Sequence, residues 1–242
     1  MQQQLPDDFY FSQLALNVFK QCPLKFRFRY LDQLYWPESR GSREKKQFME
    51  RGMKFHRLAR NYYDRGVAKA GNLQDKKLQK WFESLRGFCP YNEEDRFQPE
   101  FELRINCSDV RLLAKYDLLY INNKQNEIFI YDWKTNKKPL SREKLGDSLQ
   151  TSVYLLVLSQ AVNRYFSLDK KITPGDLKIV YWNPRFPQKE ISLGYSIAEY
   201  TADKEKIKNL ISIIKNMSYE DFSDKYNKKS CSFCQYSNLC QK

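Results

Sequence analysis

The spacing of apolar residues changes twice along the chain, from helical to strand-like and back again. Apolar residues recur at helical spacing over residues 9–35, with a break at Pro23, and again over residues 44–65 and 74–87. From Gln98 they alternate with polar residues, which is typical of half-buried strands. We therefore expect a helical first part of the chain, followed by a sheet.

The middle and the end of the chain supply the remaining elements. Three consecutive strands are predicted in the segments PEFELRIN, VRLLAKYDLLYIN and EIFIYDWKTN, between residues 99 and 136. A helix is predicted over residues 145–166, where an apolar stripe is formed by Leu145, Leu149, Val153 and Leu156. Strands at 177–184 and 189–196, a helix at about 199–217 and a tail rich in cysteine complete the chain.

This order of elements predicts one α/β domain over residues 1–242. Its helical N-terminal part is expected at about 1–97, its core with a mixed central sheet at about 98–218, and its C-terminal cysteine cluster in the tail at about 219–242.

The charge of the chain indicates a polyanionic partner. Forty-two Lys and Arg residues against 29 Asp and Glu give a formal charge of +13. An excess of lysine is also compatible with a merely solvated surface, but aromatic residues alternate with basic ones in FRFRYLDQLYW and NYYDR, a mixture that suits stacking on unpaired bases. No apolar run reaches the roughly 20 residues of a membrane span. We expect a soluble cytoplasmic protein that binds nucleic acid and no membrane.

Four of the six cysteines suggest a metal centre. Cys231, Cys234 and Cys240 lie close together in CSFCQYSNLC, one thiolate short of the four that a structural zinc ion or an iron–sulfur cluster requires. Cys22 is the candidate for the fourth ligand. A metal centre that joins it to the tail closes a long loop, and in the loop-entropy model this constraint on the unfolded chain stabilises the fold by roughly 5 kcal/mol.

Other roles for the cysteines carry less weight. Disulfides need an oxidising compartment, and MQQQLPDDFYFSQLALN lacks the features of a signal peptide. Cys89 and Cys107 stand alone and are expected to be inert buried thiols. For the other four cysteines, the spacing does not decide between zinc and iron–sulfur.

The candidate chemistry lies at the end of the third predicted strand. Asp132 and Lys134 are two residues apart, so their side chains leave the same face of an extended strand. Asp117 lies on the preceding strand, and an antiparallel pairing can bring the two carboxylates to one metal ion. Carboxylate oxygens are the ligands that Mg²⁺ and Mn²⁺ prefer. Charged residues also end many strands for no chemical reason, so this motif is informative only with others.

Five motifs in order provide that context. They are GMKFH with Gly52 and His56, PEFEL with Glu100, AKYDLLYI with Asp117, YDWKT with Asp132 and Lys134, and QTSVY with Gln150 and Tyr154. Their order resembles the RecB-like branch of the PD-(D/E)XK nuclease superfamily, over nearly the whole chain. The split cysteines resemble the [4Fe–4S] clasp of AddB-type helicase–nucleases and CRISPR-adaptation exonucleases, and the layout is similar to small standalone members of the superfamily.

The resemblance implies a restriction-endonuclease-like core and a role for each motif residue. It assigns His56, Asp117 and Asp132 to a Mg²⁺ or Mn²⁺ site and Lys134 to catalysis. It makes Gln150 and Tyr154, which are one helical turn apart, residues that position the active site and the substrate strand. Glu100 is a weaker candidate because Glu102 offers a similar carboxylate, and Gly52 is expected to let its helix approach the sheet. The implied cluster ligands are Cys22, Cys231, Cys234 and Cys240.

The function implied is that of a metal-dependent DNA nuclease, either an exonuclease or one that prefers single strands, with a structural [4Fe–4S] cluster. The resemblance places it in DNA repair or recombination, with DNA as its substrate and a helicase or another repair protein as its partner. The chain contains no phosphate-binding G-x-x-x-x-G-K-[ST] loop of its own. Two alternatives are a nucleic-acid-binding subunit that keeps the nuclease fold without catalysis, and a zinc-stabilised basic domain.

Overall fold

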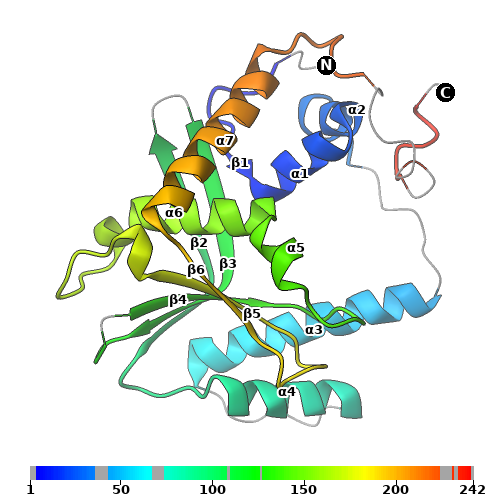
Figure 1. Cartoon of the computed structure of the whole chain (residues 1–242). Helices are drawn as coiled ribbons and strands as arrows, with labels where there is room; N and C mark the ends of the chain where they lie inside the picture. Colours follow the sequence, from blue (N-terminus) through cyan, green and yellow to red (C-terminus); the bar gives the residue numbers. More distant parts are fainter. Residues whose placement is uncertain are drawn as a thin grey trace.

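A six-stranded mixed sheet separates two groups of helices (Figure 1). The computed structural model describes residues 4–35, 43–66, 74–107, 110–125, 127–223, 231 and 234–240. The α/β class expected from the sequence is confirmed. None of the helices in these ranges is both long and apolar enough to cross a bilayer.

The N-terminal part consists of a short strand and several helices. These elements are β1 (Phe11–Ser12), α1 (Gln13–Gln21), α2 (Pro23–Phe26), a π-helical turn (Arg27–Leu31), α3 (Arg43–Arg65) and α4 (Lys76–Phe88). The break expected at Pro23 is confirmed, because Cys22 has extended backbone angles and caps the N-terminus of α2. The two-residue β1 was not predicted.

The remaining elements match the predicted order. They are β2 (Arg96–Cys107), β3 (Val110–Asn122), β4 (Glu127–Trp133), α5 (Arg142–Gly146), α6 (Leu149–Tyr165), a 3-10 turn (Pro174–Asp176), β5 (Leu177–Trp182), β6 (Ile191–Gly194) and α7 (Ile197–Asn216). The helix predicted over residues 145–166 is two helices, because Ser148 leaves helical geometry and its hydroxyl caps α6 through the backbone N–H of Thr151.

Strand β3 is the centre of the sheet. One of its edges pairs with β2 along almost its whole length. Its other edge is shared: Leu112 and Leu113 pair with the parallel β1, whereas β4 pairs antiparallel from Leu118 onward. This edge therefore forks between residues 113 and 118, and β4 continues away from the fork beside the parallel β5.

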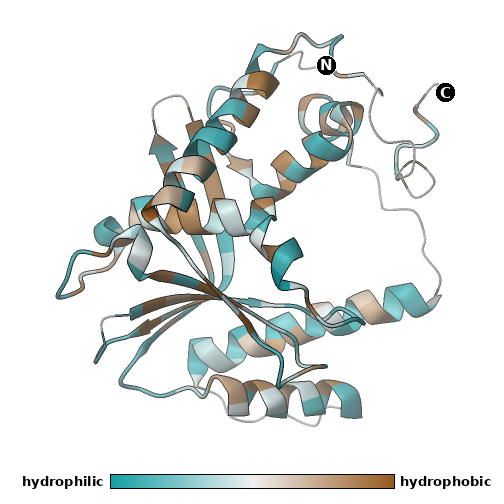
Figure 2. Cartoon of the chain, in the orientation of Figure 1, coloured by the Kyte–Doolittle hydropathy of each residue, from teal (hydrophilic) through white to brown (hydrophobic). Residues whose placement is uncertain are grey.

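Two hydrophobic cores cover the two faces of the sheet. The larger core joins the sheet to α1, α6 and α7, and the smaller one joins it to α3 and α4. Figure 2 shows hydrophobic stretches along the central strands and hydrophilic residues along much of α3 and α7. Helix α6 is buried on most of its surface, which explains why its apolar residues extend beyond the predicted stripe.

The two ends of the chain meet in the larger core. The ring of Phe222 stacks on that of Phe26 with a centroid distance of 5.9 Å. Farther along the chain, the Tyr236 hydroxyl donates a hydrogen bond of 2.6 Å to the carbonyl oxygen of Leu34, and its ring packs against Phe28. The cysteine-rich tail is thereby attached to the segment that follows Cys22.

Candidate active site

The fork in the sheet places Asp117 beside the end of β4. The β3–β4 ladder stops at the pair of Leu118 and Tyr131, so the next position in register would pair Asp117 with Asp132. The backbone N–H of Trp133 instead donates a hydrogen bond of 2.7 Å to Oδ2 of Asp117. At the point where the two strands separate, the Asp117 carboxylate thus accepts a hydrogen bond that a main-chain carbonyl oxygen would accept in a continuous ladder.

Glu100 lies opposite Asp117 on the other side of β3. The β2–β3 ladder skips this position, and Glu100 has a φ of 52°, a conformation that non-glycine residues rarely adopt. Side chains switch faces here: Tyr116 belongs to the larger core, but Leu118 belongs to the smaller one, although residues two apart on a regular strand share a face. The local strain keeps the two carboxylates on the α3 side of the sheet.

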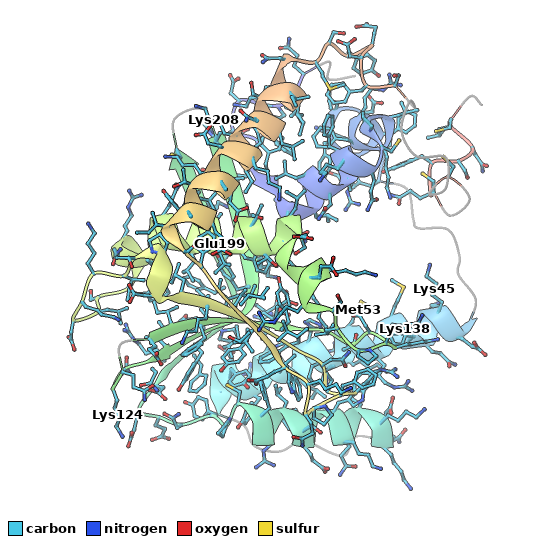
Figure 3. All side chains as sticks on the ribbon, in the orientation of Figure 1. Lys45, Met53, Lys124, Lys138, Glu199 and Lys208 are labelled. Atoms are coloured by element: carbon cyan, nitrogen blue, oxygen red, sulfur yellow. The ribbon has the colours of Figure 1, made fainter. Side chains whose placement is uncertain are left out.

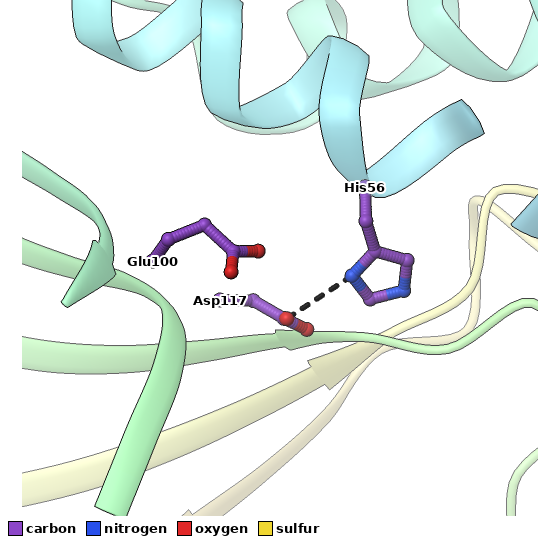
Figure 4. Close-up of side chains that lie close together, drawn as sticks. All are labelled: His56, Glu100 and Asp117. Carbon is purple, nitrogen blue, oxygen red and sulfur yellow. Dashed lines mark hydrogen bonds and ion pairs between the residues drawn. The ribbon is translucent and has the colours of Figure 1, made fainter. Parts of the chain in front are cut away.

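His56 completes a group of three candidate metal ligands (Figure 4). Its ring projects from α3, and Nδ1 lies 3.0 Å from Oδ1 of Asp117. One ligand atom each from His56, Glu100 and Asp117 lies within 4.8 Å of the other two, and all three residues are half-buried. Two carboxylates and an imidazole form a donor set that fits a divalent cation such as Mn²⁺ or Mg²⁺.

A second group of polar side chains lies on the α6 side of Asp132. Oδ1 of Asp132 is 2.5 Å from the ammonium of Lys134, which confirms that the two residues share a strand face. Gln150 on α6 bridges the pair: its Nε2 donates to Oδ2 of Asp132 at 2.7 Å, and its Oε1 accepts from Lys134 at 2.8 Å. Apart from the ion pair with Lys134, Oδ1 of Asp132 is buried without a hydrogen-bond partner among the described residues, so it can accept a further ligand.

Burial and charge change the protonation behaviour of this site. Burial raises the pKa of Asp132 to about 6; the positive charge of Lys134 opposes this shift, and the negative charge of Asp117 adds to it. Burial lowers the pKa of His56, but its hydrogen bond with Asp117 and the charges of Asp117 and Asp132 outweigh that effect, so the pKa lies above its ordinary value. The pKa of Asp132 and the pKa of His56 therefore each depend on the charges of the neighbouring residues.

The structure brings the predicted site residues together in two subsets. Glu100, which the sequence ranked below the others, lies with His56 and Asp117, whereas Asp132 lies with Lys134 and Gln150. The role of Asp132 as a metal ligand remains a prediction. Glu102 is separate from both subsets, because its carboxylate pairs with Arg104 on the exposed surface at 2.9 Å.

Tyr154 lies behind the site as a mostly buried residue. Its ring packs against Tyr116 at a centroid distance of 5.0 Å, and the Tyr116 hydroxyl donates a hydrogen bond to the Tyr154 carbonyl oxygen. Burial and the charge of Asp132 raise the pKa of the Tyr154 hydroxyl well above its ordinary value, so this hydroxyl stays protonated. It can therefore support Gln150 only as a neutral group.

Two supporting residues were not identified from the sequence. The ammonium of Lys115 lies 2.6 Å from the Glu100 carboxylate. Thr135 faces Gly52, where an added Cβ would lie 2.8 Å from the threonine Oγ1, so α3 approaches the loop after β4 closely at this glycine. Lys115 lies on β3, next to the strand that carries Glu100, but the register of the two strands could not be known from the sequence. The sequence feature that could have identified Thr135 is its position directly after the catalytic candidate Lys134.

The cysteines of the predicted cluster belong to the two chain segments that the hydrogen bond from Tyr236 to Leu34 joins. The Cys22 thiol accepts a hydrogen bond from the backbone N–H of Lys25 at 3.4 Å. Burial raises the pKa of Cys22, hydrogen bonds from the backbone of Lys25 and Leu24 oppose this shift, and the charges of Cys234 and Cys231 add to it. Cys89 is buried, as expected, whereas Cys107 is only half-buried.

Comparisons with known proteins agree with this architecture. The family model of the PD-(D/E)XK nuclease superfamily matches residues 10–241. A crystal structure from Eubacterium rectale, described as a "Putative exonuclease", is similar at a TM-score of 0.54 and 10% identity, covering 96% of this chain and 90% of that one. The crystal structure of SSO0001 matches at a TM-score of 0.40 and 16% identity, over 98% of this chain and 88% of that one. No curated protein sequence matches the chain significantly.

Proposed function

The chain belongs to the PD-(D/E)XK nuclease superfamily, and from this premise we propose that it is a Mg²⁺- or Mn²⁺-dependent deoxyribonuclease. The observation that carries the proposal is the convergence of His56, Glu100 and Asp117 beside the pair of Asp132 and Lys134. Such a combination of hard ligands and an ammonium suits the hydrolysis of a phosphodiester.

The residues of the chain have distinct tasks in this proposal. His56, Glu100 and Asp117 would hold the metal ion, with Oδ1 of Asp132, whose one partner among the described residues is the Lys134 ammonium, as a further ligand. The bound ion would polarise the phosphate and lower the pKa of a water molecule.

The ammonium of Lys134 is held by two hydrogen-bonding neighbours and supplies positive charge where negative charge develops on the phosphate. Gln150 fixes the orientation of both Asp132 and Lys134, and Tyr154 packs behind this pair.

DNA with a single-stranded region or free ends is the proposed substrate, cut as by an exonuclease. The formal charge of +13 supports a polyanionic ligand held mainly through its phosphates. The resemblance to the RecB-like and AddB-type nucleases supports a role in DNA repair or recombination beside a helicase or another repair protein. A cytoplasmic location follows from the same proposal.

A [4Fe–4S] cluster bound by Cys22, Cys231, Cys234 and Cys240 is the second part of the proposal. Four thiols form the donor set that such a cluster requires. The hydrogen bond from Tyr236 to Leu34 supports it, because it attaches the cysteine-rich tail to the segment that follows Cys22. The cluster would be structural, because it joins the two ends of the chain and shares no ligand with the candidate active site.

A cleavage assay tests the enzymatic proposal. Anaerobically purified protein should degrade single-stranded DNA with Mg²⁺ or Mn²⁺ and not with EDTA, and Asp132→Ala should abolish cleavage while DNA binding is retained. DNA binding without cleavage by the wild type with either metal would instead indicate the non-catalytic binding subunit.

Metal analysis tests the cluster. The wild type should contain about four iron atoms per chain. Cys22→Ser should lose them, whereas Cys89→Ser, which changes a buried thiol outside the cluster, should keep them. Stoichiometric zinc without acid-labile sulfide would refute the cluster and support a zinc site.

A further inference from the structure

Two cationic side chains lie over one aromatic ring near the start of α3, and a third cation, Arg51, follows that ring by three residues along the helix. The ring belongs to Phe48. The guanidinium carbon of Arg185 lies 5.1 Å from its centroid, and the ammonium of Lys137 lies 5.5 Å from it. Arg185 also lies 4.9 Å from the ring centroid of Trp81 on α4. The two cations come from the loops after β5 and β4, so the fold itself brings like charges together.

Arg51 is the third cation, and little negative charge balances the group. Its guanidinium pairs with Asp75 at 2.7 Å, which is the one ion pair that these three cations make with any described residue. Arg51 and Phe48 are three residues apart on α3 and so lie on one face of that helix, and Arg185 lies over the Phe48 ring. Burial lowers the pKa of Arg185, and the charge of Arg51 lowers it further. An anion between these side chains would therefore relieve their repulsion.

Arg185 also has an unused donor. Its Nε is buried and has no hydrogen-bond partner among the described residues. Buried N–H groups are nearly always paired in native proteins, and a charged donor is the most costly to leave unpaired. The contacts with Phe48 and Trp81 account for the position of the guanidinium plane. They do not satisfy this Nε, which an oxyanion can do.

The group lies at the edge of a cleft that includes two of the candidate metal ligands. Phe48, His56 and Glu100 line the same cleft, which has a volume of about 520 Å³. Figure 3 shows Lys138, the neighbour of Lys137 in the chain, on the loop that passes Met53 of α3, another residue of this cleft. Eight residues of helix separate Phe48 from His56, a distance of about 12 Å along the axis.

We propose that Lys137 and Arg185, supported by Arg51, bind one backbone phosphate of the substrate strand. The phosphates of a stacked strand rise by about 3.4 Å per nucleotide along its axis. The length of about 12 Å between Phe48 and His56 therefore corresponds to about three to four nucleotides of a stacked strand. We call these three residues the phosphate cradle. The inference rests on the proposed function, because the strand must also pass His56 and Glu100.

The cradle makes the binding of DNA independent of sequence at this position. A guanidinium can donate two parallel hydrogen bonds to a phosphate, and its stacking on Phe48 and Trp81 keeps it oriented before the strand arrives. Lys137 adds a point charge from the exposed side. Such contacts fix where the strand lies and so which bond reaches Lys134.

Binding of single-stranded DNA at several salt concentrations tests the cradle. Fluorescence anisotropy with a labelled oligonucleotide in EDTA measures affinity without cleavage. We expect Lys137→Gln and Arg185→Gln each to weaken binding about 10-fold at 0.1 M salt, and the slope of log affinity against log salt to fall by about 0.7. Arg185→Lys should retain the slope and lose less affinity. Thermal denaturation checks folding, and the exposed Lys137→Gln variant keeps the test valid if Arg185→Gln does not fold.

Lys208→Gln is the matched control, because it removes the same charge from the exposed surface of α7, across the sheet from α3 (Figure 3). Equal losses of affinity and slope in Lys137→Gln and Lys208→Gln would overturn the cradle. If the wild type cleaves DNA and the variants give this result, the phosphate cradle is refuted and the proposed nuclease function stands. If the wild type does not cleave DNA, yet substitutions at Lys137 and Arg185 selectively weaken binding, the cradle stands and the proposed catalytic function is refuted.

Discussion

Replacing Asp132 by asparagine should make the metal-free protein more stable at pH 8 while it abolishes cleavage. The carboxyl group is almost fully buried, with 3% of the residue exposed. Asparagine has nearly the same shape and removes the negative charge that repels Asp117. Its single oxygen can accept from Lys134 or from Gln150 but not from both, which offsets part of the gain. The substitution therefore separates the energetic cost of the buried charge from its function.

The magnitude follows from the pKa of the buried group. In the folded protein the Asp132 pKa is about 6, against an ordinary value of 3.8. At roughly 1.36 kcal/mol per pKa unit, the ionised form costs the folded state at most about 3 kcal/mol. Because the folded pKa is raised, the stability that the protonated group contributes is fully present below about pH 4 and is lost as the pH rises through 6. Asp132→Asn should thus gain about 1–3 kcal/mol at pH 8 and little at pH 4.

Denaturant unfolding in EDTA between pH 4 and pH 8 measures this difference. Asp176→Asn provides a control of opposite sign. Hydrogen bonds from Thr173 and Lys170 lower the Asp176 pKa to about 2, so its carboxylate stabilises the fold above about pH 4 and stops doing so as the pH falls toward 2. Asp176 also closes a capping box with Thr173, so its loss should cost about 1 kcal/mol at pH 8.

The opposite result at Asp132 would refute this reasoning. If Asp132→Asn is less stable than the wild type at pH 8, and its stability depends on pH as that of the wild type does, then burial does not dominate the energetics of this carboxyl group. The pair with Lys134 would instead be strong enough to stabilise the ionised form.

Three further outcomes are expected. Glu100→Gln should weaken Mn²⁺ binding in calorimetry at least about 10-fold, because it removes one charged ligand; unchanged binding would exclude Glu100 from the metal site. Tyr236→Phe should cost about 1 kcal/mol through the lost hydrogen bond to Leu34 and speed proteolysis of the tail; equal proteolysis would mean that this contact does not hold the tail. Gly52→Val should slow cleavage, because its side chain meets Thr135, and a wild-type rate would show that α3 can move away.

The periodic parts of the fold follow from local sequence. The strand period places β3 within its observed bounds, and helix α3 begins within one residue of its expected start. Asp132 and Lys134 share a face because they are two residues apart on one strand, so their contact could be predicted without knowing the fold. The same holds for the i, i+4 pair Gln150 and Tyr154 on α6. These features depend on the geometry of a single element.

The metal group depends on distant parts of the chain and on an irregularity. Glu100 meets Asp117 only through the register of β2 on β3, and it reaches the α3 side because its backbone departs from strand geometry. The fork that frees Asp117 requires the two-residue β1, which is too short to produce a pattern of its own. A regular strand pattern therefore could not distinguish Glu100 from Glu102, which lies on the same predicted strand face.

No sequence pattern could predict the contacts between loops. Lys137 and Arg185 follow different strands, and only the parallel pairing of β4 with β5 brings their loops to the same edge of the sheet, beside Phe48. Periodicity records which face of an element is buried, because burial of apolar area is a local property of each residue. Which elements become neighbours, and at which register, is decided by packing of the whole chain.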